Sequence, residues 1–260
     1  MSRLPIVFFG HGSPMVALEK SAITRQWKAM ADRIGRPRAI LCISAHWQTR
    51  GTAVTAMPSP RTIHDFGAFP QALFDMQYPA PGDPELALRV RELLAPMEVT
   101  LDTGWGFDHG TWTVLVHAYP EADIPVVQLG MDLAKTPQQH WEVGRSLRAM
   151  RDEGVLIMAS GNIVHNLPAM DWGNPLAEPY PWAKAFNDTM CHAVESDTPE
   201  VAIDYQALGD AARYAVPSAD HFLPLLYFLG ARHEGEKVEF APHFIQHKSL
   251  SMTSILIGAD

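Results

Sequence analysis

The stretch that decides the fold is Leu4-Pro5-Ile6-Val7-Phe8-Phe9-Gly10-His11-Gly12-Ser13-Pro14-Met15. Its first half is an apolar run rich in Val, Ile and Phe, which predicts a buried β-strand. The strand stops at Gly10, and His11 then stands between two glycines ahead of a Ser-Pro turn. Glycine on both sides lets the backbone turn sharply and lets a ligand come close to it. Because α/β proteins bind ligands at the carboxyl ends of their strands, we expect His11 to lie at a binding edge.

Two further predicted strands lead to a histidine in the same way. Residues 38–44 form an apolar run that ends in Ala45-His46-Trp47, and residues 155–159 form another that leads to Gly161-Asn162-Ile163-Val164-His165-Asn166. A single histidine of this kind usually does no more than hydrogen-bond a loop. Three of them at the carboxyl ends of neighbouring parallel strands predict one shared site for His11, His46 and His165.

The rest of the chain alternates strand and helix patterns. Helices are expected at 21–34, with Ser21 as N-cap and Gly35 as stop, and at 84–94, 109–119 after Asp108, 137–153, 181–195 and 219–229, the last capped by Ser218. Further strands are expected at 52–56, 125–129, 238–244 and 251–257, the last two as candidates for antiparallel pairing. This alternation predicts an α/β fold with a mostly parallel or mixed central sheet and helices on both faces. No break in composition divides the chain, so we expect a single domain over residues 1–260.

Composition and charge exclude several classes of protein. With 260 residues, 47% hydrophobic and 19% charged, the chain can bury one large core. A net charge of −9 without clustered basic residues disfavours a nucleic-acid partner. The sequence has neither an apolar run long enough for a membrane span nor the pattern of a signal peptide, so a cytoplasmic protein without a membrane partner is expected. Cys42 and Cys191 form no zinc-finger or disulfide pattern, whereas twelve histidines favour a metal site built from imidazole.

Two more histidines, His109 and His221, lie near the starts of predicted helices, His221 in the first turn of its helix. The helix dipole there disfavours the imidazolium form, so both can ligate a metal or accept a proton. The chain lacks the H-E-x-x-H, G-x-S-x-G, G-x-x-x-x-G-K-[ST] and G-x-G-x-x-G patterns of zincins, serine hydrolases and nucleotide-binding loops. The other histidines are interpreted as ordinary except His64, which lies in the proline-rich 58–81 loop: His117, His140, His192, His233, His243 and His247.

Six motifs, in this order, resemble those of one known family. They are Gly10-His11-Gly12-Ser13-Pro14-Met15, Ser44-Ala45-His46-Trp47, Ile63-His64-Asp65-Phe66-Gly67, Gly106-Phe107-Asp108-His109-Gly110, Gly161-Asn162-Ile163-Val164-His165-Asn166 and His221-Phe222-Leu223-Pro224-Leu225-Leu226-Tyr227. They resemble the DOPA 4,5-dioxygenase-type extradiol dioxygenases, which are class III enzymes related to the catalytic subunit of protocatechuate 4,5-dioxygenase. The resemblance extends from residue 4 to about residue 258.

This resemblance implies one mononuclear divalent metal held by His11, His46 and His221. The wider class usually presents a carboxylate at the third position, which gives the two-histidine, one-carboxylate face suited to Fe(II). Here the third position is a histidine, and an all-imidazole site is neutral and also suits zinc. We therefore expect Fe(II) for dioxygenase activity, with Zn(II) as a metal that the isolated protein could also carry.

By the same resemblance, His165 is the acid–base residue and His109 a hydrogen-bonding partner of bound oxygen or substrate. The chemistry needs such groups, because a catechol must lose protons to chelate a metal and a proton must later be returned. His165 remains open as a fourth metal ligand. His64, Ser13 and Trp47 are candidate substrate contacts, and Asp220 is interpreted as an exposed helix cap.

The resemblance implies 4,5-extradiol cleavage of a catechol such as DOPA by O₂, giving a semialdehyde. Its partners would be a small aromatic diol and O₂, and the chain would be a monomer or a small homo-oligomer. Two alternatives stay open at this point. One is a zinc-dependent hydrolase that uses the same imidazoles to activate water. The other is a non-catalytic relative that binds metal or catechol.

Overall fold

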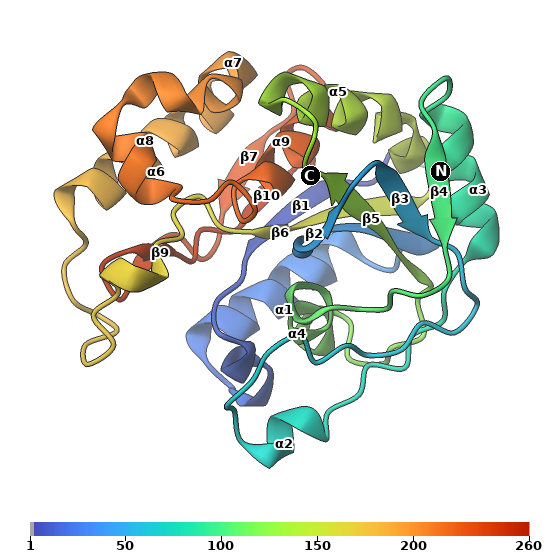
Figure 1. The fold of residues 1–260 in the computed structure, drawn as a ribbon, viewed down its shortest axis with the longest axis horizontal. Helices are drawn as coiled ribbons and strands as arrows, with labels where there is room; N and C mark the ends of the chain where they lie inside the picture. Colours follow the sequence, from blue (N-terminus) through green and yellow to red (C-terminus); the bar gives the residue numbers. More distant parts are fainter. Residues whose placement is uncertain (1–2, 260) are drawn as a thin grey trace.

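The structure, a computed structural model that describes residues 3–259, is built around an eight-stranded sheet (Figure 1). The strand order is β4-β3-β5-β2-β6-β1-β10-β7. The strands are β1 Ile6–Gly10, β2 Ala39–Thr49, β3 Thr52–Thr55, β4 Val99–Asp102, β5 Val126–Asp132, β6 Val155–Gly161, β7 Val238–Phe240 and β10 Ile255–Ile257. A separate antiparallel pair joins β8 Ile245–Gln246 to β9 Leu250–Ser251.

The centre of the sheet is parallel and its edges are mixed. Strand β2 runs parallel to both β5 and β6, and β6 runs parallel to β1. Strand β10 is antiparallel to both β1 and β7, and β3 is antiparallel to β5 but parallel to β4. The carboxyl ends of β1, β2 and β6 therefore lie at one edge of the sheet, and the predicted mixed α/β sheet is confirmed.

Helices cover both faces of the sheet (Figure 1). On one face lie α1 Ala22–Ile34 and α4 His109–Ala118, and on the other lie α3 Pro84–Leu93, α5 Pro137–Leu147, α6 Pro181–Glu195 and α9 Leu223–Gly230. Strand β1 shows why two cores form: Ile6 and Phe8 pack into one cluster, whereas Val7 and Phe9 pack into the other. This follows from the two-residue period of a strand, whose side chains alternate between faces.

Several helix ends form as their sequence predicts. The Ser21 side chain accepts from the Thr24 backbone N–H in a capping box, and α1 ends at Gly35, whose φ is 79°. The Asp108 side chain caps α4 by accepting from the Thr111 backbone N–H. Helix α6 has the predicted bounds.

Other elements depart from the expectation. The expected helix 137–153 ends as α5 at Leu147 and continues as the 3₁₀ helix η2 Arg148–Glu153. Strand β2 does not stop at residue 44 but continues to Thr49 after a register shift against β5. Helix α9 begins at Leu223, so Ser218 is not its cap and His221 lies in the turn before it. The remaining short elements were not predicted: α2 Gln71–Phe74, α7 Pro199–Ile203, α8 Asp210–Ala215, η1 Pro14–Leu18, η3 Leu167–Ala169, η4 Tyr205–Leu208 and strands β4, β8 and β9.

The predicted strand 238–244 is shortened to β7, and β10 covers only the end of the predicted strand 251–257. Their antiparallel pairing is confirmed. Between residues 3 and 259, none of the helices combines the length and apolar character needed to cross a bilayer.

Candidate metal centre

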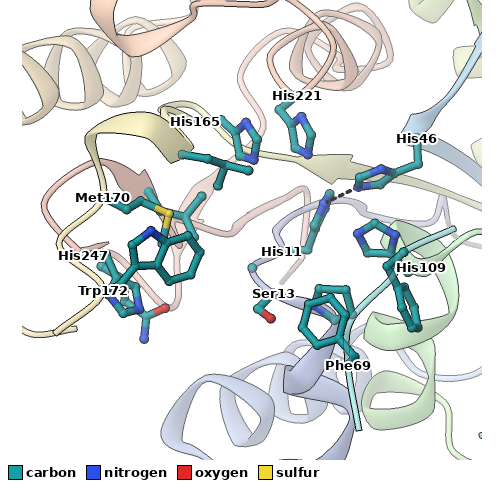
Figure 2. A pocket seen from close by; sticks show the side chains of 16 residues that line it. His11, Ser13, His46, Phe69, His109, His165, Met170, Trp172, His221 and His247 are labelled. Carbon is teal, nitrogen blue, oxygen red and sulfur yellow. Dashed lines mark hydrogen bonds between the residues drawn. The ribbon is translucent and has the colours of Figure 1, made fainter. Parts of the chain in front are cut away.

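Five histidines cluster at the carboxyl edge of the sheet, in a cavity of about 280 Å³ that a sixth, His247, also lines (Figure 2). They come from separate segments: His11 from the end of β1, His46 from β2, His109 from the start of α4, His165 from the loop after β6 and His221 from the turn before α9. The predicted meeting of His11, His46 and His165 is therefore observed. The structure brings His109 and His221 to the same place.

Glycines allow these segments to approach one another closely. A Cβ on Gly161 would lie 2.3 Å from the backbone oxygen of His221, and a Cβ on Gly110 would lie 2.8 Å from Cδ2 of His46. Both distances are too short for non-bonded atoms, so a side chain at either position would push a histidine out of place. The glycines of these two motifs are thus required by packing around the imidazoles.

The tautomer of His11 follows from its hydrogen bonds. The Ser160 hydroxyl donates to the carbonyl oxygen of Gly110 at 2.5 Å, and its oxygen lies 2.9 Å from Nδ1 of His11. Because a hydroxyl has one hydrogen to donate, Nδ1 of His11 must be the donor to Ser160. The neutral ring then carries its lone pair on Nε2, which lies 3.0 Å from Nε2 of His46.

Two carboxylates orient two further rings. Nδ1 of His109 lies 2.9 Å from Oδ2 of Asp65, while the His109 backbone N–H donates to Oδ1 of the same residue at 2.8 Å. Nδ1 of His221 lies 2.8 Å from Oδ2 of Asp220. Ionised carboxylates only accept hydrogen bonds, so both rings donate through Nδ1 and keep Nε2 free. The interpretation of Asp220 as an exposed cap is corrected, because its carboxylate is partly buried against His221.

Burial keeps the imidazoles neutral. Burial, reinforced by the neighbouring histidines, holds the pKa values of His11 and His46 well below the usual histidine value. The same two causes lower the pKa of His165 to about 3. Burial opposes ionisation of Asp65, but its hydrogen bonds with His109 keep the pKa of that carboxyl below its usual value. At neutral pH the rings of His11, His46 and His165 are therefore uncharged and carry available lone pairs.

This donor set fits a divalent metal. The ligand nitrogens of His11, His46 and His109 all lie within 4.8 Å of one another. The 3.0 Å between the Nε2 atoms of His11 and His46 is about the spacing of two imidazoles that share one ion at ~2.1 Å. His221 is close to the same point, with its ring centroid 5.3 Å from that of His11 and 5.0 Å from that of His46. Neutral imidazoles suit iron and zinc.

Of the candidate substrate contacts, only Ser13 lines the cavity, where its side chain also caps η1. His64 lies outside the lining, because its Nε2 is bonded to the carbonyl of Met76 and its ring packs on Phe74. Trp47 also lies outside, stacked on Trp105 at 5.8 Å. The cavity lining thus does not include His64 or Trp47, and a contact of either with the substrate stays a prediction.

Sequence reasoning missed several lining residues and one orienting residue. His247 was interpreted as ordinary but lines the cavity, together with Phe69, Met170 and Trp172. No motif marks these positions, because they come from loops that meet only in the folded chain. Asp65 could have been found, since it lies inside the quoted motif Ile63-His64-Asp65-Phe66-Gly67 and adjoins the histidine that was chosen instead.

Comparison with known proteins agrees with this arrangement. Residues 6–258 match the family described as the catalytic LigB subunit of aromatic ring-opening dioxygenase. A 4,5-DOPA dioxygenase extradiol of Escherichia coli (strain K12) is 49% identical, over 99% of this chain and 96% of that protein. A protein of the same name from Beta vulgaris is 38% identical, over 89% of this chain and 88% of that protein.

A solved structure shares the fold. The crystal structure of an uncharacterized protein from Escherichia coli K12 superposes with a TM-score of 0.84 at 44% identity, covering 98% of this chain and 100% of that one. The family match spans nearly the whole chain, and the relatives align along almost all of their own length. The chain therefore belongs to the family of catalytic LigB subunits of aromatic ring-opening dioxygenases, and the protein is a non-haem dioxygenase of this class III extradiol type.

Proposed function

We propose that this protein is an Fe(II)-dependent extradiol dioxygenase that opens a catechol ring, with DOPA as one candidate substrate. The observation that carries the proposal is the convergence of five histidines on one cavity in a chain of the LigB family. The relatives named 4,5-DOPA dioxygenase support cleavage between carbons 4 and 5 to a semialdehyde.

In this proposal His11, His46 and His221 hold the metal. His11 and His221 each donate through Nδ1 to a fixed partner, Ser160 and Asp220, and so present a free Nε2. When bound, the iron supplies open positions for the two catechol oxygens and O₂ and a path for electrons from the ring to oxygen. His109 then remains beside the substrate with its own Nε2 free, because Asp65 accepts from its Nδ1.

His165 is proposed to move the proton. Burial and the neighbouring His221 lower the pKa of His165 and hold its ring neutral, so a ring nitrogen has a lone pair to offer to an incoming catechol hydroxyl. The imidazolium that forms can return this proton to the departing oxygen later in the cycle. Its backbone is fixed for the task, since its N–H donates to the carbonyl oxygen of Ala215. His109 would accept a hydrogen bond from the substrate through its free Nε2, because its Nδ1 donates to Asp65.

The cavity walls suit a planar ring. Phe66, Phe69 and Leu250 line the same cavity as the histidines. Aromatic and aliphatic walls exclude water and gain free energy from contact with an aromatic ring. Water exclusion also strengthens hydrogen bonds between the substrate and the imidazoles.

The proposal is tested by reconstituting the metal site under anaerobic conditions. Metal-free protein is loaded with Fe(II), supplied with catechol or DOPA, and exposed to oxygen in an electrode chamber. We expect stoichiometric oxygen uptake and a yellow semialdehyde product or its cyclised derivative. Absence of both with every catechol tried, in protein that retains one iron per chain, would contradict the proposal.

The all-imidazole donor set also suits zinc, so a zinc-loaded sample is the matched control. A ring-opening dioxygenase loses its activity with Zn(II), because zinc has no redox chemistry to offer O₂. A hydrolase on the same site would instead keep its activity with Zn(II) and would consume no oxygen.

A further inference from the structure

His11 lies in a backbone segment that is free to turn. It stands between Gly10 and Gly12 at the end of β1, and glycine restricts the backbone dihedral angles less than any other residue. A histidine that holds a metal must nevertheless keep its imidazole within a narrow range of positions. Contacts from other segments therefore have to fix the backbone of His11.

Both polar groups of the His11 backbone are bonded to residues 161 and 162, where β6 ends. The N–H of His11 donates to the carbonyl oxygen of Gly161 at 3.2 Å. The carbonyl oxygen of His11 accepts from the side-chain Nδ2 of Asn162 at 2.5 Å. Asn162 is only 1% exposed, so this bond is shielded from water. Removing the amide would deprive a buried carbonyl of a donor, which is more costly than at the surface.

Asn162 also holds the turn that carries His221. Its backbone N–H donates to the carbonyl oxygen of His221 at 2.8 Å. The two histidines that Asn162 bonds have their ring centroids 5.3 Å apart (Figure 2). One residue thus joins two segments that are far apart in sequence and that each supply a proposed metal ligand.

A third segment is bonded to the same amide. Nδ2 of Asn162 also donates to the carbonyl oxygen of Ser251 in β9 at 2.8 Å. These two bonds fix the orientation of the amide, because the opposite orientation would place Oδ1 against two carbonyl oxygens. Oδ1 itself is buried and has no hydrogen-bonding partner among the described residues. The side chain therefore holds His11 through its N–H groups alone.

We propose that Asn162 is a positioning residue of the metal site, which sets the placement of His11 relative to His221 by donating to the backbone of both. It acts through these two histidines and does not itself line the cavity. The inference rests on the ligand roles proposed for His11 and His221, and it adds to them a residue that reaches neither metal nor substrate.

The first test removes the side-chain donor. Asn162→Ala keeps the backbone N–H that bonds His221 but leaves the carbonyl of His11 free to move. The probe is Co(II) added to metal-free protein and followed by calorimetry and by visible absorption. We expect the affinity for Co(II) to fall about tenfold, the lower end of the usual effect of residues that orient metal ligands. The absorption bands should also shift, because they report how the ligands are arranged. Unchanged affinity with unchanged bands would overturn the inference.

The second test keeps the shape of the side chain and removes its hydrogens. In Asn162→Asp the ionised carboxylate has nothing to donate and faces two carbonyl oxygens, so we expect a larger loss of Co(II) affinity than in Asn162→Ala. Asn162→Ser is the milder change, because its hydroxyl keeps one hydrogen for one of the two carbonyls, and its affinity should lie between those of the unaltered chain and Asn162→Ala. Circular dichroism of the metal-free variants shows which of them are folded. An Asp or Ser variant that binds Co(II) as tightly as the unaltered chain would contradict the proposed hydrogen-bonding role.

The matched control is Asn187→Ala, which removes another buried amide. Asn187 on α6 is 2% exposed, and its Oδ1 accepts from the hydroxyl of Ser251 at 2.6 Å. It therefore supports the same β9 segment from the side of α6. We expect the metal-free Asn187→Ala protein to lose thermal stability much as Asn162→Ala does, yet to bind Co(II) within about twofold of the unaltered chain. An equal loss of affinity in both variants would mean that general loosening explains the effect, and the inference would fail.

The metal titrations need no turnover, so they separate the two proposals. If the unaltered chain binds Co(II) but its iron form opens no catechol, the proposed function fails and the titrations still decide the role of Asn162. If the iron form opens catechols and Asn162→Ala binds metal like the unaltered chain, only the inference fails. If the unaltered chain binds no divalent metal, both fail.

Discussion

The imidazole of His165 lies flat against that of His221, with ring centroids 3.5 Å apart and planes 4° from parallel. The lone pairs of an imidazole lie in the plane of its ring. In two parallel stacked rings these lone pairs run side by side and do not converge on one atom. The stack therefore favours His165 as a proton carrier next to a metal ligand, and disfavours its proposed alternative as a fourth ligand unless its ring turns.

The first prediction separates these roles for His165. In His165→Ala we expect kcat to fall by about 10² to 10⁴, the usual contribution of a general acid–base group. Iron content, measured by mass spectrometry after loading and desalting, should stay near one per chain. Loss of iron together with activity would instead identify His165 as a ligand.

The second prediction concerns the third ligand. His221 is proposed for this place, yet the nitrogens of His109 approach those of His11 and His46 within 4.8 Å. If His221 holds the metal, His221→Ala should lower iron affinity at least about tenfold. His109→Ala should keep the iron and lose turnover.

Direct metal titrations of both variants, with His117→Ala as the control, decide whether His221 or His109 is the third ligand. His117 is a suitable control because it lies on the same helix as His109 and bonds the carbonyl of Val16, away from the cavity. The opposite result, with iron lost in His109→Ala and retained in His221→Ala, would reassign the third ligand.

The third prediction concerns Asp65, which holds His109 through two hydrogen bonds. In Asp65→Asn the side-chain amide no longer provides two negative acceptor oxygens, so the Nδ1–H tautomer of His109 loses its stabilisation. We expect kcat to fall about 10- to 100-fold, as is usual when an orienting partner is removed. KM for catechol should change less, and the pH profile of kcat should shift.

Asp75→Asn serves as the matched control for that experiment. Asp75 is exposed in the same proline-rich region and only accepts a hydrogen bond from Gln71. Its substitution should leave kcat and the pH profile unchanged. A similar loss in both variants would show that the loop as a whole, rather than the bond to His109, sustains activity.

The sheet and the meeting of the strand-end histidines could be predicted because they depend on local patterns. An apolar run that ends at glycine marks β1, and Ser21 and Asp108 mark helix starts through their own side-chain caps. His46 was expected just after its strand, whereas it lies within β2. Strand β2 continues past Ser44 to Thr49 through a mixture of apolar and polar residues, and its pairing with β5 shifts register between Ile43 and Gln48, which no periodic pattern reveals.

The part of the cavity lined by Trp172 and His247 could not be predicted in the same way. Trp172 lies in an irregular loop, and His247 lies in a tight turn with a φ of 50°. Their contact joins segments far apart in sequence. These segments are held together by the bridge between His165 and Leu250 and by the Asp171 backbone N–H, which donates to the carbonyl oxygen of His247. Likewise, the turn that holds His221 has the composition of a helix start, so its pattern alone predicted an earlier beginning of α9.

The last prediction concerns stability against pH and uses a histidine outside the cavity. His140 on α5 is fully buried, and its Nδ1 lies 2.8 Å from the Tyr227 hydroxyl. Burial is the main cause that lowers its pKa from 6.5 to about 4. Between these two values the unfolded chain binds a proton that the folded chain does not. The free energy of unfolding should therefore fall as the pH decreases from 6.5 toward 4, by about 1.4 kcal/mol per pH unit for each such histidine.

The contribution of His140 is isolated by comparing how steeply the free energy of unfolding changes with pH in different variants. His11, His46 and His165 add to the same slope in metal-free protein, so urea unfolding is measured on that form at several pH values. His140→Gln retains a hydrogen-bonding partner for Tyr227 but cannot titrate, and its slope should be smaller by about one proton. His192→Gln, an exposed position on α6, should keep the full slope. Equal slopes for His140→Gln and the unaltered chain would mean that His140 is protonated in the folded protein, against the effect expected from its burial.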